Sequence, residues 1–143
     1  MTNLERYPYL ESRNAQGEAM PRPLLPLTLQ YDRQSVAVDG LLDTGATVNV
    51  LPYEIGLALG CTWSERLRAV ALTGNLARYA ARVIPLIGIV GQLTPVPLIF
   101  AWTQAENVPL ILGQVNFFAE FDVCFFGSSL AFEIQPKGSR PSD

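Results

Sequence analysis

Apolar and polar side chains alternate from residue 24 onward. In an extended chain, four apolar residues of this stretch share one face: Leu25, Leu27, Leu29 and Tyr31. This alternation predicts a strand over residues 24–31. The polar residues 32–34 predict a hairpin turn, and a second strand is expected over residues 35–42. A short apolar run predicts a further strand over residues 48–51.

The rest of the sequence repeats short apolar runs that are separated by turn residues. Pro52 suits the first position of a helix and Gly60 a stop, so a short helix is predicted over residues 52–59. One or two helical turns are expected over residues 114–121. Further strands are predicted at residues 66–72, 77–84, 84–89, 93–102, 109–113, 122–126 and 130–134. Many short strands with at most two short helices indicate a mostly antiparallel, all-β domain that forms a barrel or a sandwich.

The chain has 143 residues, which fit one domain with a polar segment at each end. Residues 1–22 are polar and lead into a proline-rich junction, so we expect a loose or partly ordered N-terminal arm. Residues 23–135 form the predicted domain. Residues 136–143 hold proline and glycine and are expected to be a disordered tail.

Composition narrows the function classes. Hydrophobic residues make up 49% of the chain and charged residues 16%, which favours a packed core over disorder. The net charge is −3 and no basic patch is visible, so we expect no nucleic-acid partner. No apolar run approaches a membrane span, and the first residues lack the apolar core of a secretory signal. We therefore expect a cytoplasmic protein with no membrane partner.

The sequence contains no histidine, which excludes Ser-His-Asp and Cys-His catalysis and histidine-based metal sites. Acid–base chemistry near neutral pH must then fall on carboxylates, or on an unusual Cys, Lys or Tyr. Cys61 and Cys124 are expected to be two buried thiols, although a disulfide between them stays open. We expect no metal and no cofactor.

The strongest candidate for chemistry is the string Asp43-Thr44-Gly45-Ala46. It follows the predicted strand 35–42 directly and precedes the strand 48–51. A carboxylate at the end of a buried strand is costly unless it has a partner or a use. Gly45 allows a tight turn beside the carboxylate.

This string, with the apolar residues on both sides, resembles the active-site loop of single-domain, retropepsin-like aspartic proteases (clan AA). Two later features fall where that family would place them. Thr73-Gly74-Asn75, about 30 residues after the Asp, resembles a flap tip between two strands. Leu110-Ile111-Leu112-Gly113 resembles the family's paired aliphatic residues and glycine, which pack beneath the catalytic loop. The resemblance implies a retropepsin-like β-barrel with one lobe per chain.

The resemblance also implies roles for residues of this chain. Asp43 would be the catalytic residue, and Thr44, Gly45, Ala46 and Gly113 would support the active-site loop. Residues 73–75 would close over a peptide or protein substrate that binds as an extended strand. Because the chain has one such loop, a monomer would hold half of a two-carboxylate site. A homodimer would supply the second Asp43 at a two-fold axis.

One departure from viral relatives concerns two neutral positions. Those relatives pair an acidic residue shortly after the loop with an arginine after the aliphatic-Gly motif, whereas this chain has Thr47 and Gln114. Two alternatives to the protease stay open. One is a catalytically silent dimer of the same fold that binds extended peptides. The other is a β-barrel interaction protein in which the Asp-Thr-Gly string is an ordinary turn.

Overall fold

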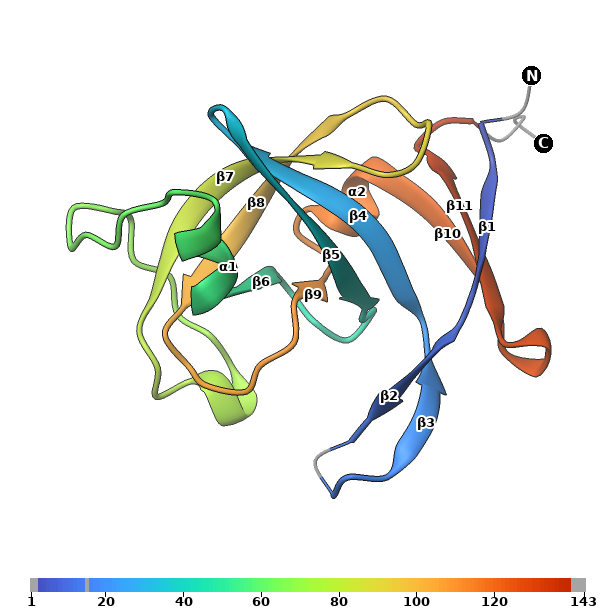
Figure 1. Cartoon of the computed structure of the whole chain (residues 1–143), viewed down its shortest axis with the longest axis horizontal. Helices are drawn as coiled ribbons and strands as arrows, with labels where there is room; N and C mark the ends of the chain where they lie inside the picture. Colours follow the sequence, from blue (N-terminus) through green and yellow to red (C-terminus); the bar gives the residue numbers. More distant parts are fainter. Residues whose placement is uncertain (1–2, 15, 140–143) are drawn as a thin grey trace.

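The computed structural model describes residues 3–14 and 16–139, and its centre is a closed barrel (Figure 1). The neighbouring barrel strands are, in order, β4 (Leu24–Tyr31), β5 (Gln34–Leu42), β9 (Ile111–Leu112), β6 (Asn49–Pro52), β8 (Val96–Thr103) and β7 (Ala81–Ile89). The predicted all-β class with few short helices is confirmed.

Local alternation builds the first hairpin of the barrel. Leu25, Leu27 and Leu29 are all at most 4% exposed, so the predicted apolar face of β4 points into the core. β4 pairs antiparallel with β5 along its full length through a turn at Asp32, whose φ is 54°. The barrel closes where Thr28 of β4 lies opposite Ile89 of β7.

The helices are short. α1 (Tyr53–Ala58) lies within the predicted range, whereas α2 (Phe117–Glu120) is half as long as the predicted helix. Single 3-10 turns occur at Gly74–Leu76 and Gly127–Ser129. Among the described residues, no helix has the length and apolar character that crossing a membrane requires.

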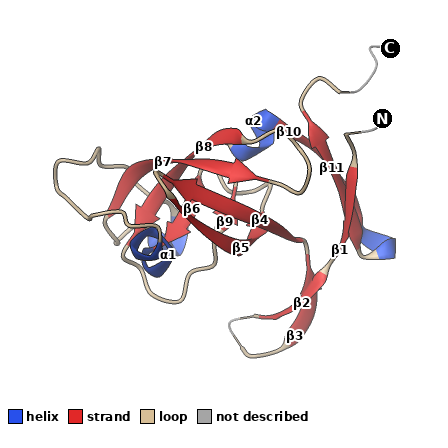
Figure 2. Cartoon of the chain, turned by 45° about the horizontal axis from the view of Figure 1, so that its top comes forward, coloured by secondary structure: helices blue, strands red, loops and turns tan. Residues whose placement is uncertain are grey.

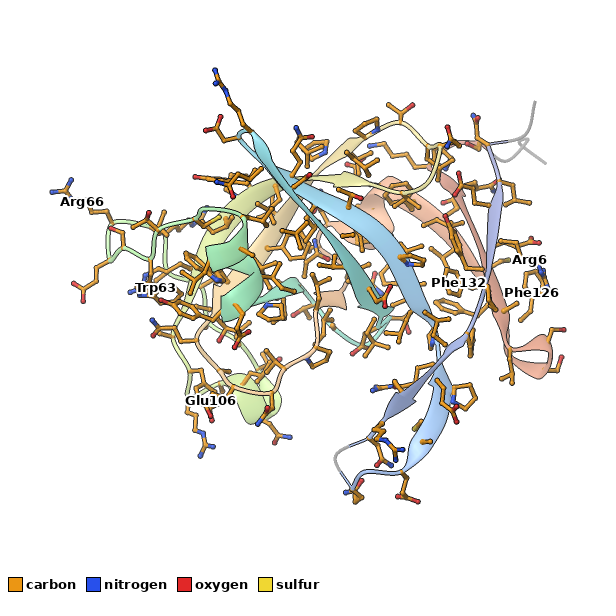
Figure 3. All side chains as sticks on the ribbon, in the orientation of Figure 1. Arg6, Trp63, Arg66, Glu106, Phe126 and Phe132 are labelled. Carbon is orange, nitrogen blue, oxygen red and sulfur yellow. The ribbon has the colours of Figure 1, made fainter. Side chains whose placement is uncertain are left out.

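The segment expected to be a loose or partly ordered N-terminal arm contains a strand of a second sheet. β1 (Glu5–Pro8) pairs with β11 (Ala131–Pro136), which also pairs with β10 (Phe121–Phe126). Phe132 of this sheet is fully buried and points toward the barrel (Figure 3). Because β1 finds its partner more than 120 residues away, local sequence patterns could not predict the pairing.

Further contacts hold β1 in place. The Glu5 carboxylate accepts hydrogen bonds from the Tyr7 hydroxyl and from the Gln92 backbone N–H. Burial, and then the bond to Glu5, raises the pKa of Tyr7. Arg6 lies over the Phe126 ring, 5.0 Å from its centroid, and pairs with Glu133 on the outer side of the sheet (Figure 3). The segment is therefore an integral strand of the fold.

The remaining two strands form a separate hairpin. β2 (Leu10–Arg13) and β3 (Ala19–Arg22) pair only with each other within the described sheets. The hairpin extends away from the barrel in both views (Figures 1 and 2). At the other end of the chain, β11 runs to Pro136, so the predicted tail begins inside a strand. Residues 140–143 of that tail lie outside the described part.

Candidate active site

The backbone of Asp43 is fixed at the end of β5. Its N–H donates to the Leu112 carbonyl at 3.0 Å, and the Leu41 N–H donates to the Leu110 carbonyl at 2.8 Å. Leu41 and Leu42 are buried, whereas Asp43 is half-buried. The strand therefore anchors the residue in the core while its side chain reaches a surface pocket.

The loop after Asp43 folds back on the carboxylate. The Gly45 N–H donates to Asp43 Oδ1 at 3.0 Å, and the Ala46 N–H donates to the Asp43 carbonyl at 3.1 Å. A Cβ added to Gly45 would lie 3.3 Å from Asp43 Oδ1, which is tighter than most contacts of a real Cβ. Thr44 and Gly45 are exposed at the tip of the loop. The carboxylate is thus oriented by the turn that follows it, and the tip of the loop is exposed.

Gly113 lies directly beneath this loop. A Cβ at this position would approach the Val48 carbonyl oxygen to 2.6 Å and the Ala46 carbonyl oxygen to 2.8 Å. The next residue, Gln114, donates its backbone N–H to the same Ala46 carbonyl at 2.9 Å. Two chain segments cross here at a distance that excludes any side chain, which explains why the position holds glycine.

We expect Gly113→Ala to lower the free energy of unfolding by about 1–3 kcal/mol, because its methyl group meets backbone that cannot move cheaply. Urea denaturation measures the change. Gly127→Ala is the matched control, since a Cβ at Gly127 meets nothing within 4 Å. A Gly113 variant as stable as that control would show that the backbone around Val48 and Ala46 shifts to make room for the methyl group at little cost.

Sequence reasoning missed Asn49. This residue is fully buried, and its Oδ1 accepts the Gly113 N–H at 2.8 Å. Its Nδ2 donates to the Ile99 carbonyl at 3.0 Å and to Asn116 Oδ1 at 3.3 Å. Asn116 in turn accepts the Ile99 N–H and donates to the Pro97 carbonyl. The two amides tie β6 to β8 and to the Gly113 crossing.

The signal for Asn49 was present in the sequence. A polar residue that interrupts the apolar run 48–51 is buried, and a buried amide needs partners. Its position was visible in the sequence, but its partners come from segments about 50 and 64 residues away.

Gln114 anchors the loop through an uncharged hydrogen bond. Its Nε2 donates to the Thr44 carbonyl at 2.8 Å. The Thr47 carbonyl accepts the Val115 N–H at 2.8 Å. The segment after Gly113 therefore holds both ends of the loop with uncharged hydrogen bonds.

Asp43 lines a surface pocket of about 210 Å³. The loop residues Gly45 and Ala46 line it, together with Thr73 from the predicted flap tip. Its apolar wall is formed by Val48, Val50, Leu72, Leu76 and Ile111. Gly74 and Asn75 follow Thr73 in an exposed 3-10 turn.

The predicted hairpin around this tip is wrong in its first strand. Residues 66–72 are irregular apart from a bridge between Ala69 and Arg82. Two backbone hydrogen bonds remain, from Val70 N–H to the Ala81 carbonyl and from Val83 N–H to the Arg68 carbonyl. The side chains of Leu67, Val70 and Leu72 pack against the core, whereas the other side chains of the segment are exposed. The predicted strand 77–84 begins only at Ala81, because residues 77–80 form a turn, and from there it is continuous with the predicted strand 84–89 as β7.

Asp39 and the two cysteines do not line this pocket. Asp39 is exposed on β5. Cys61 is a buried thiol, as expected, and its burial raises its pKa. Cys124 was also expected to be buried but is half-buried.

Comparisons with known proteins support the fold. No protein-family model matches the sequence, and no curated protein matches it. Among solved structures, the chain is similar to a retropepsin-like aspartic protease from Rickettsia conorii, with a TM-score of 0.60 and 17% sequence identity. The match covers 93% of each chain. At this identity the likeness is one of fold, so the chain has a retropepsin-like fold.

Proposed function

We propose that this chain is an aspartic endopeptidase that works as a homodimer, with one Asp43 from each copy. The observation that carries the proposal is the position of Asp43. On a retropepsin-like fold, it lies at the end of a buried strand, in a pocket, with its carboxylate bonded to the Gly45 N–H.

Two carboxylates at a shared site supply the chemistry that hydrolysis of a peptide bond needs. Like charges a few ångströms apart do not ionise together, so one Asp43 keeps a proton. The ionised Asp43 takes a proton from water as the water oxygen attacks the scissile carbonyl carbon. The protonated Asp43 donates to the carbonyl oxygen. The C–N bond then breaks as the other Asp43 passes the proton it took from water to the leaving amine, and a hydroxyl of the tetrahedral intermediate returns a proton to the first Asp43. The pair titrates as a unit.

The exposed loop tip supports assembly of this pair. Thr44 and Gly45 lie outermost after Asp43, so a two-fold axis beside them would bring two such loops together. The bond from Gln114 to the Thr44 carbonyl holds the tip without a charge. The Thr44 hydroxyl would then brace the partner loop.

Substrate would enter between the loop and the segment 73–75. The apolar wall of Leu72, Leu76 and Ile111 suits an apolar side chain next to the scissile bond. Gly74 has a φ of +63°, and a Cβ added to it would meet nothing within 4 Å, so the tip projects into open space from which it could close over a bound peptide.

Cleavage of a peptide library by the purified chain, from about pH 4 to about pH 7, tests the proposal. We expect cleavage whose specific rate rises with protein concentration until the dimer is saturated, because a monomer holds half a site. Sedimentation measurements over the same concentrations give the dimer fraction for comparison.

Two results would contradict this expectation. Peptide binding without cleavage at any concentration would favour the catalytically silent dimer. A constant specific rate in samples that are monomeric would exclude a site shared between two copies.

A further inference from the structure

The hairpin β2–β3 stands apart from the rest of the molecule. It extends from the barrel in both views, and none of its described residues, 10–14 and 16–22, is fully buried (Figures 1 and 2). By contrast, the sheet of β1, β11 and β10 buries Phe132 and Ile134 completely. The hairpin therefore has no core of its own.

The shape of the hairpin is nevertheless well defined. Four residue pairs join its strands, from Leu10 opposite Arg22 to Arg13 opposite Ala19. At its tip, Asn14 Oδ1 accepts the backbone N–H groups of Gln16 at 3.0 Å and Glu18 at 2.9 Å. A two-stranded hairpin in water is marginally stable without a surface to pack on. The hairpin is only partly buried within its own chain, and the buried Ser12 Oγ has no hydrogen-bond partner there, so the hairpin is suited to pack on a partner.

The root of the hairpin lies beside the candidate active site. The Pro23 carbonyl, directly after β3, accepts the Leu42 N–H at 3.0 Å, and Asp43 is the next residue. A two-fold axis near Asp43 therefore passes close to the root of both hairpins. Four residues of strand span about 13 Å, a length that would let the hairpin reach a second copy placed across that axis.

The side chains of the hairpin suit a second copy of this chain. Because cross-strand partners share a face, Leu10, Ser12, Met20 and Arg22 lie together. Met20 on this face is 43% exposed, which is high for an apolar side chain. The hairpin carries two acidic and two basic residues, Glu11, Glu18, Arg13 and Arg22. Because these charges cancel, the hairpin would neither attract a strongly charged partner nor be repelled by an identical hairpin.

We propose that the β2–β3 hairpin is a dimerisation arm that lies on a second copy of this chain. The proposal rests on the homodimer of the proposed function and names the surface that holds it together. Contact between arm and partner body adds area to an interface that the short loop tips could not stabilise alone.

Sedimentation equilibrium on the full chain and two variants tests the arm. In the first variant, two glycines replace residues 11–21, because Leu10 and Arg22 are cross-strand partners that a two-residue turn can join. We expect its dimer dissociation constant to rise at least about 100-fold, with thermal unfolding showing that the barrel is intact. The second variant, Met20→Asp, leaves the hairpin in place and is expected to raise the constant about tenfold.

Leu57→Asp is the matched control. Leu57 is 49% exposed on α1, away from the hairpin in both views (Figures 1 and 2), so its substitution is expected to leave dimerisation unchanged. Peptidase activity is measured on the same samples, so that the arm and the proposed function are judged separately.

The outcomes separate the two proposals. A wild-type dimer that survives both arm substitutions would overturn the arm and leave the peptidase untouched. Loss of the dimer with full activity per chain would support the arm and contradict the shared site. A wild-type chain that stays monomeric at all concentrations would overturn the arm and assign the hairpin to a different partner.

Discussion

Asp43→Asn is expected to lower peptidase activity at least about 1,000-fold while leaving the fold intact. An amide has almost the same shape as a carboxylate and can still accept the Gly45 N–H at its oxygen. It cannot take a proton from water or exchange one with the second copy. Since each dimer carries two copies of the change, no active half remains. Cleavage of the best library peptide measures the loss.

Asp39→Asn is the matched control for this variant. Asp39 lies on the same strand, four residues earlier, and is exposed, so the substitution makes the same change in charge away from the pocket. We expect its activity to stay within about twofold of wild type and the stability of both variants to stay within about 0.5 kcal/mol. Full activity in the Asp43 variant would exclude the two-carboxylate mechanism.

Asn49→Leu is expected to lower the free energy of unfolding by about 2–5 kcal/mol, which is the largest effect on stability predicted for a single side chain here. The substitution keeps a similar volume but removes the partner of three groups: the Gly113 N–H, the Ile99 carbonyl and Asn116 Oδ1. Because Asn49 is fully buried, water cannot replace the lost bonds. Urea denaturation followed by tryptophan fluorescence measures the change.

Gln104→Leu provides the comparison for Asn49→Leu. It also converts an amide to leucine, but at an exposed position after β8, so the expected change in stability is within about 0.5 kcal/mol. If the free energy of unfolding of the Asn49 variant fell by less than about 1 kcal/mol, the groups that bond to Asn49 would have other hydrogen-bond partners in the variant. Activity is expected to fall in the variant even where it is folded, since Asn49 holds Gly113 beneath the loop of Asp43.

Elements with strong local alternation were predicted well. The strand 24–31 has the observed bounds, because its apolar face follows the two-residue period of an extended chain. The helix at 52–59 was predicted to within one residue at each end from its proline and glycine. The loop 43–46 could be singled out because an acid next to a buried run is unusual.

The elements and contacts that were predicted wrongly or missed depend on pairing between distant segments. The strand predicted over 66–72 is irregular although Leu67, Val70 and Leu72 pack against the core, because its backbone pairs with β7 only around Ala69. β1 was missed because its pairing with β11 depends on a contact between the two ends of the chain. In the same way, the bond from Gln114 to the Thr44 carbonyl joins residues 70 positions apart.

The sequence by itself determined the β class, the position of Asp43 at a strand end and the need for glycine beside it, since these depend on local period and turn chemistry. Only the tertiary structure decided how that loop is held. Asn49, Gly113 and Gln114 meet it through hydrogen bonds and a close backbone crossing between distant segments. Such contacts depend on how the barrel closes. The tertiary structure also decided that the β2–β3 hairpin projects from the barrel, since a strand's neighbours are set by the whole fold.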